Sequence, residues 1–138
     1  MIILDTNVIS ELMKPEPSPK VFRWVSRQSP LDLFTTTTSK AEVLYGIALL
    51  PKGKRRNLLQ AAAESMFAED FANRILPFDE DAARVFPEIV VARRSTGRPI
   101  AVLDAQIAAI ARSRASAVAT RDTRGFGDCG VTVLNPWS

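Results

Sequence analysis

Four acidic residues follow or flank predicted strands, where chemistry is commonly done: Asp5, Glu42, Asp104 and Asp122. Asp5 comes directly after the apolar run 2–4, and Asp122 follows the apolar run 117–119 in the same way. Ligands of open α/β sheets bind in the crevice at the carboxyl ends of the strands, so we expect these acids to converge. Carboxylates brought together repel one another unless some are protonated or a cation binds them. The pattern therefore indicates a site for a divalent cation.

The chain contains no histidine, which excludes Ser-His-Asp triads and every zinc site that needs imidazole. An all-oxygen set of ligands suits Mg²⁺ or Mn²⁺. Such a cation can activate water and stabilise the leaving oxygen of a phosphodiester. The converging acids Asp5, Glu42, Asp104 and Asp122 are therefore the candidates for binding such a cation.

Each acid also has a purely structural interpretation. Ser39 and Glu42 have the spacing of a capping box, and this spacing alone favours a helix cap over a catalytic role for Glu42. Asp104 would suit the first turn of a helix because of the helix dipole. Asp122 would suit a turn, and Asp128, in a glycine-rich turn, is a weaker candidate for the site.

Polar and basic neighbours of the acids could support the same chemistry. Thr6 and Thr120 could hydrogen-bond an acid or a phosphate group, and Asn7 could orient Asp5 or cap the following helix. The net charge is +3, and clustered basic residues near the acids favour phosphate contacts over a merely solvated surface. The residues predicted to make these contacts are Arg94, Arg98, Arg121 and Arg124.

The elements that must position these residues alternate between strand and helix. Strands are predicted over 2–4, 31–36, 75–78, 117–119 and 131–134. Helices are predicted over 8–13, 20–28, 39–50, 55–71, 80–95 and 102–112, with Pro87 expected to bend or split the fifth. Such alternation predicts an α/β fold with a mostly parallel sheet covered by helices on both faces. The first strand should be central, because the later acids must converge on Asp5.

Composition predicts one cytoplasmic domain over residues 1–138. The chain is 46% hydrophobic and 24% charged, as is usual for a globular protein. No apolar run approaches the ~20 residues that a membrane span requires, and Asp5 interrupts the first run too early for a signal peptide. Cys129 is the only cysteine, so no internal disulfide can form. We therefore expect no membrane association.

Five motifs together resemble those of PIN-domain ribonucleases, in particular the VapC/FitB-like toxins of bacterial toxin–antitoxin pairs. The opening motif is Leu4-Asp5-Thr6-Asn7-Val8-Ile9-Ser10-Glu11-Leu12. The other stretches, in the order and spacing of the family, are 36–46, 103–108, 119–122 and 134–137. Each motif alone is weak, but the set spans nearly the whole chain and is specific.

The resemblance implies a parallel five-stranded sheet sandwiched by helices, and cleavage of RNA that depends on Mg²⁺ or Mn²⁺. Asp5, Glu42 and Asp104 fall on the three core acids of the family, whereas many members carry asparagine where this chain has Asp122. The resemblance also implies a homodimer and a small cognate antitoxin that inhibits the active site. Binding to promoter DNA would occur only through the antitoxin.

Two other functions are compatible with parts of the sequence. The first is a non-catalytic module of the same fold that binds RNA or a protein partner, without bound metal. The second is a phosphotransfer domain of the receiver or phosphatase kind with Asp5 as the nucleophile. Asn7 stands where such phosphatases carry a second aspartate, and the last lysine, Lys54, comes too early for a receiver, so this function is disfavoured.

Overall fold

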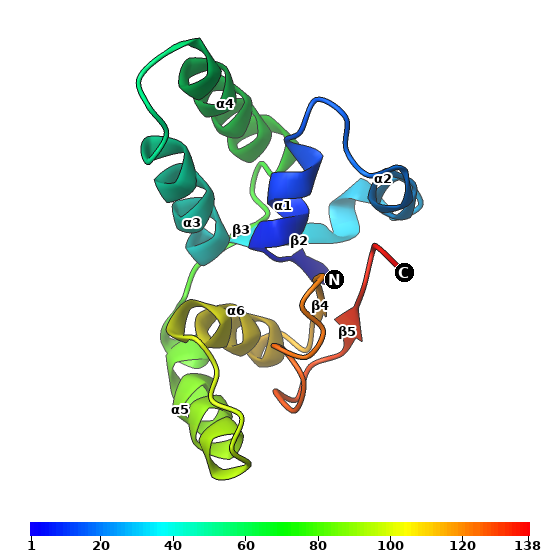
Figure 1. Cartoon of the computed structure of the whole chain (residues 1–138). Helices are drawn as coiled ribbons and strands as arrows, with labels where there is room; N and C mark the ends of the chain where they lie inside the picture. The colour runs from blue at the N-terminus through cyan, green and yellow to red at the C-terminus, as the bar shows by residue number, and fades with distance from the viewer.

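The computed structural model describes all 138 residues and contains one five-stranded parallel sheet (Figure 1). Its strands are β1 (Ile2–Leu4), β2 (Leu33–Thr36), β3 (Ile75–Leu76), β4 (Ala117–Ala119) and β5 (Val133–Leu134). They lie in the order β3-β2-β1-β4-β5, so the first strand of the chain is the central one. The predicted α/β fold, the five parallel strands and the central position of β1 are confirmed.

Six helices surround this sheet: α1 (Thr6–Leu12), α2 (Pro19–Ser26), α3 (Thr37–Ala48), α4 (Lys54–Ser65), α5 (Glu80–Ser95) and α6 (Val102–Ser113). A 3₁₀ turn, Pro30–Asp32, precedes β2, and a π-helical turn, Met66–Asp70, extends α4. In Figure 1, α1 to α4 lie on one side of the sheet, and α5 and α6 lie on the other. No helix is both long and apolar enough to cross a bilayer.

Two apolar cores form because each strand buries side chains on both faces. Ile3 and Val118 pack with residues of α5 and α6, whereas the next residues, Leu4 and Ala119, pack with residues of α1 to α4. Successive side chains of a strand point to opposite faces, which explains this division. The central strands β1 and β4, which are buried on both faces, are apolar throughout, as the sequence showed.

The register of β1 and β4 brings their carboxyl ends together. Leu4 lies opposite Ala119 in the parallel pairing, and the Asp5 amide donates a hydrogen bond to the Ala119 carbonyl at 3.1 Å. Asp5 and Thr120, the residues that follow each strand, therefore emerge side by side at one edge of the sheet.

Two predicted features of the helices differ from the structure. The helix predicted from residue 39 begins at Thr37, because Thr36 caps it: its hydroxyl accepts a hydrogen bond from the Ser39 amide at 3.0 Å. Helix α5 runs unbroken through Pro87. Proline leaves the carbonyl of Ala83, four residues earlier, without its helical donor, but Ala83 is exposed, so water can bind that carbonyl.

Candidate active site at the carboxyl edge of the sheet

Asp5 occupies the junction between the central strand and α1. It caps the helix, since its Oδ1 accepts a hydrogen bond from the Val8 amide at 3.2 Å. Only 4% of the residue is exposed. Capping and burial together fix the carboxyl group at the carboxyl end of β1.

Burial raises the pKa of Asp5 from 3.8 to about 6, because a charged carboxylate loses hydration there. Hydrogen bonding from the Thr120 hydroxyl and from the Val8 and Asn7 amides offsets part of this rise, and the nearby charge of Asp104 adds to it. The ionised form of Asp5 is therefore incompletely stabilised by the protein. A bound cation would supply the missing stabilisation.

Glu42 does not form the capping box that its spacing favoured. Thr36 is the N-cap of α3, and Glu42 lies one turn further into the helix than a capping partner of Thr36 would. The Glu42 carboxylate instead accepts a hydrogen bond from the Thr6 hydroxyl at 2.7 Å, and that hydroxyl also lies 3.1 Å from the Ser39 hydroxyl oxygen. Thr6 directly follows Asp5 in the chain, so this hydrogen bond holds Glu42 close to the carboxyl end of β1.

Asp104 lies in the first turn of α6 and is half-buried. Burial raises its pKa, and the negative charges of Glu42 and Asp122 raise it further, while Arg93 lowers it. These effects show that the carboxylates contributed by α3, α6 and the loop after β4 lie near one another. The convergence predicted from the strand ends is therefore present.

Asp122 is an exposed residue of the loop after β4. Its amide donates to the Thr120 hydroxyl and its Oδ1 accepts from the Gly125 amide, both at 3.0 Å. A Cβ atom at Gly125 would lie 2.2 Å from Asp122 Oδ2, so any larger residue there would displace this carboxylate. The local turn holds Asp122 in place, as its turn interpretation predicted, yet the residue still faces the other acids.

One cavity of about 490 Å³ contains all four predicted acids. Its lining residues are Asp5, Thr6, Asn7, Ser10, Glu11, Lys14, Glu42, Asp104, Arg121, Asp122, Phe126 and Trp137. The acids share this cavity without forming a compact cage: no three acidic or cysteine side chains lie close enough to hold a metal ion as they stand. The four side chains are nevertheless all carboxylates, and the pKa values of Asp5 and Asp104 are raised. Such oxygen ligands match the preference of a hard divalent cation.

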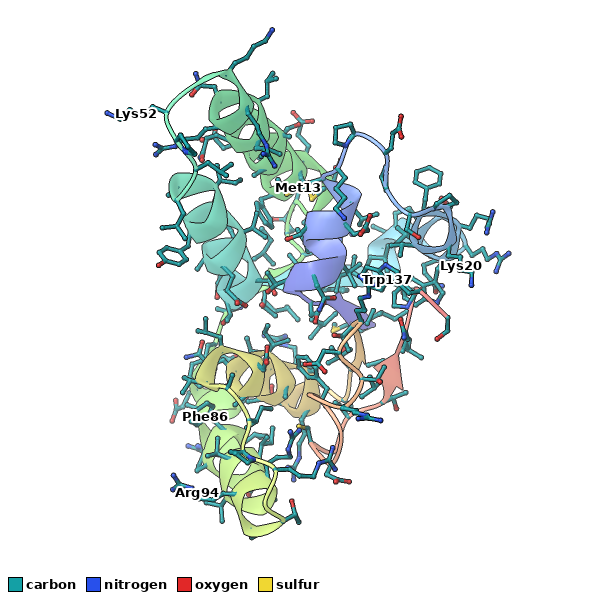
Figure 2. All side chains as sticks on the ribbon, in the orientation of Figure 1. Met13, Lys20, Lys52, Phe86, Arg94 and Trp137 are labelled. Atoms are coloured by element: carbon teal, nitrogen blue, oxygen red, sulfur yellow. The ribbon has the colours of Figure 1, made fainter.

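Of the four arginines predicted to contact phosphate, only Arg121 lines this cavity. Its amide donates to Asn7 Oδ1 at 3.2 Å, and its guanidinium lies 5.3 Å from the centroid of the Trp137 ring. Arg98 instead pairs with Asp128 at 2.7 Å and donates to the carbonyl of Arg124 at 3.1 Å. Figure 2 shows the fourth, at residue 94, near the far end of α5.

Glu11 and Trp137 are cavity residues that sequence reasoning did not select. Glu11 is only 7% exposed and accepts hydrogen bonds from the Ser18 amide and the Lys14 ammonium, both at 3.0 Å. Those contacts, the Ser18 amide first, hold the pKa of Glu11 below its usual value. The spacing of Glu11 and Lys14 on a helix was a usable signal, whereas nothing local placed Trp137 beside α1.

A larger groove of about 690 Å³ adjoins the acidic cavity and shares Glu42 with it. It lies between α1, α3 and α4, with an apolar floor that includes Met13, Ile47 and Leu58. Lys54 and neighbouring basic residues line it as well. The acidic cavity is thus continuous with an apolar surface.

A parallel α/β sheet with acids at its carboxyl edge defines the class of open α/β proteins that bind ligands at that edge. Comparison with known families is more specific, since residues 2–130 match the PIN domain. The chain belongs to the PIN-domain family, within the group that includes VapC and FitB. The resemblance seen in the sequence motifs is confirmed.

Three relatives cover almost the whole chain. Toxin FitB of Neisseria gonorrhoeae is 42% identical over 137 residues, covering 99% of each chain. VapC ribonuclease Y4jK of Sinorhizobium fredii is 41% identical, covering 99% of this chain and 98% of the relative. The tRNA(fMet)-specific endonuclease VapC of Shigella flexneri is 30% identical, covering 99% of this chain and 97% of the relative.

Two solved structures have the same fold. The crystal structure of FitAcB from Neisseria gonorrhoeae superposes with a TM-score of 0.92 at 42% identity, covering 99% of both chains. The structure of FitAB bound to an IR36 DNA fragment superposes with a TM-score of 0.93 at 41% identity, covering 100% of this chain and 96% of the other. The arrangement of the sheet and its helices is therefore that of FitB.

Proposed function

We propose that this protein is a divalent-metal-dependent endoribonuclease and the toxin of a toxin–antitoxin pair. The observation that carries the proposal is the convergence of four carboxylates in one cavity at the carboxyl edge of the sheet. Relatives named as a ribonuclease, a toxin and a tRNA endonuclease, each matched over 99% of this chain, support it. The substrate would be cellular RNA, so we place the protein in the cytoplasm as one domain over residues 1–138.

The residues present fit a hard cation such as Mg²⁺ or Mn²⁺. Asp5, Glu42 and Asp104 would hold it, and Asp122 would support it from the loop after β4. Such a cation supplies charge neutralisation at the phosphate and lowers the pKa of water. The raised pKa of Asp5 and of Asp104 supports this assignment, because acids with perturbed pKa values cluster at functional sites.

The protein's own residues would orient these carboxylates and the RNA. Thr6 holds Glu42 through its 2.7 Å hydrogen bond. Thr120 links two acids, since its hydroxyl accepts from the Asp122 amide and hydrogen-bonds Asp5. Asn7 holds the backbone of Arg121, whose guanidinium would bind the RNA backbone.

The proposed partners follow from the relatives and from two apolar surfaces. FitB has been solved as FitAcB and as FitAB on DNA, so we propose that a cognate antitoxin binds this chain and carries any promoter DNA contact. The apolar groove beside the acids has the character of a site for an amphipathic helix. Exposed Tyr45 and Leu103, which line one shallow cavity with Phe78, support a homodimer.

The test is to incubate the purified protein with a panel of tRNAs and rRNA fragments, with Mg²⁺ or with EDTA, and to map the products. We expect discrete cleavage sites with Mg²⁺, none with EDTA, and none with an Asp5→Ala variant that remains folded. Unimpaired cleavage by that variant would contradict the proposal. Binding of RNA without metal-dependent turnover would favour a non-catalytic module.

A further inference from the structure

The acidic cavity is also lined by a basic and an aromatic residue, Arg121 and Trp137. The guanidinium carbon of Arg121 lies 5.3 Å from the centroid of the Trp137 ring, within the range of a cation–π contact. Figure 2 shows Trp137 beside α1, although it is the second-last residue of the chain. The cavity thus contains carboxylates together with an arginine that contacts an aromatic ring.

Arg121 and Trp137 are both held in place. The Arg121 amide donates to Asn7 Oδ1 at 3.2 Å, and the Trp137 amide donates to Asn135 Oδ1 at 2.9 Å. The Trp137 side chain also packs against the core formed by α1 to α4. The ring is therefore a fixed platform for the guanidinium, which reduces the ordering that binding would otherwise require.

Arg121 forms no ion pair within the chain. The five ion pairs of the protein involve other basic residues: Lys14, Arg84, Arg98, Arg112 and Arg114. Glu11 is near enough for Arg121 to lower its pKa, but Lys14 and the Ser18 amide already satisfy that carboxylate. The donors of Arg121 are thus available to an external anion.

We infer that Arg121, positioned by Trp137, forms a subsite that binds an RNA phosphate next to the one placed at the acids. The inference rests on the proposed function, which brings RNA to this cavity. A planar guanidinium has paired donors that match phosphate oxygens, and the contact with the indole ring uses none of these donors. An acidic cavity alone would repel a polyanion, and Arg121 is the exposed arginine inside the cavity that offsets this repulsion.

The test is fluorescence anisotropy of a fluorescein-labelled single-stranded RNA in EDTA, measured across a salt series. We expect Arg121→Gln to weaken binding about tenfold and to reduce the slope of log K against log salt by about 0.7, the value for one phosphate contact. Arg121→Lys should retain the slope but lose part of the affinity, because lysine keeps the charge without the planar pair of donors. Arg84→Gln, an exposed arginine paired with Glu80 on α5, is the matched charge control and should bind as the parent does.

Trp137→Leu separates a positioning role from a structural one. We expect it to weaken RNA binding in the parent but to have no further effect in an Arg121→Gln background, since Trp137 acts through that guanidinium. Additive losses, or an unchanged salt slope with Arg121→Gln, would overturn the subsite. If RNA binds through Arg121 but is never cleaved, the subsite is supported and the nuclease proposal is contradicted. If RNA is cleaved and Arg121→Gln binds it as the parent does, the nuclease proposal is supported and the subsite is contradicted.

Discussion

Two acids with little exposed surface lie near the ends of helix α1, and their pKa values are shifted in opposite directions. Asp5 precedes the helix and is 4% exposed, whereas Glu11 lies in its last turn and is 7% exposed. The pKa of Asp5 is raised to about 6, while that of Glu11 is lowered. A similarly low residue exposure therefore accompanies pKa shifts of opposite direction.

Loss of hydration is the largest cause of the raised pKa of Asp5, whereas at Glu11 hydrogen bonds outweigh a smaller loss of hydration. Glu11 accepts hydrogen bonds from the Ser18 amide and from the positively charged Lys14. Asp5 has hydrogen-bond donors but no positively charged partner, and the charge of Asp104 opposes its ionisation. A buried acid whose charge the protein balances is structural, whereas one left unbalanced is a candidate for function.

The largest expected effect comes from replacing Asp5. Asp5→Asn removes a carboxylate from the proposed cation site with little change in volume, and we expect cleavage with Mg²⁺ to fall roughly a hundredfold to a thousandfold. Glu11→Gln, corrected for the folded fraction, should stay within a few-fold of the parent. The rate of cleavage of an end-labelled RNA measures the effect of each variant. Equal losses in the two variants would contradict a special role for Asp5.

The next effect is a pH dependence of stability in metal-free protein. Folded Asp5 holds its proton more tightly than unfolded Asp5, so stability is lost as pH rises from about 4 to about 6. A rise in pKa from 3.8 to about 6 corresponds to about 3 kcal/mol, and Asp104, whose pKa is also raised, acts in the same direction. Urea unfolding in EDTA over this range should show the loss, and Asp5→Asn should remove most of it. A flat profile in the parent would disagree with an unbalanced Asp5.

The smallest effect concerns Glu11, and its sign is opposite. Because its pKa is lowered in the folded state, its contribution is present above 4.5, the ordinary value, and is lost as pH falls below it. Glu11→Gln should lower the free energy of unfolding at pH 7 by about 1–3 kcal/mol, since charged hydrogen bonds to the Ser18 amide and Lys14 are lost. Urea midpoints of parent and variant measure this, and a variant as stable as the parent would show that the network contributes nothing.

Sequence patterns predicted the fold and the converging acids because both depend on local periodicity and on the geometry of parallel sheets. Apolar runs that end in polar residues identified β1 and β4, and the carboxyl ends of parallel strands must share an edge. Placement of Asp5 and Asp122 therefore needed no knowledge of distant contacts.

The remaining features depend on contacts that the local pattern does not contain. Thr36 and Ser39 are both acceptable helix caps, but β2 ends at Thr36, which caps α3, and Glu42 accepts from Thr6 instead. Arg98 is close to the acids in sequence, but it turns to Asp128 instead. Trp137 reaches the cavity because β5 pairs in parallel with β4, so the residues after β5 emerge at the edge that carries the acids.

Calorimetric titration with Mn²⁺ at pH 7, applied to the parent, Asp5→Asn and Glu11→Gln, tests most directly whether Asp5 is the acid left unbalanced for a cation. We expect the parent and Glu11→Gln to bind Mn²⁺ with the same affinity and Asp5→Asn to bind at least tenfold more weakly. Equal binding by the parent and Asp5→Asn, or loss of binding in Glu11→Gln alone, would contradict it.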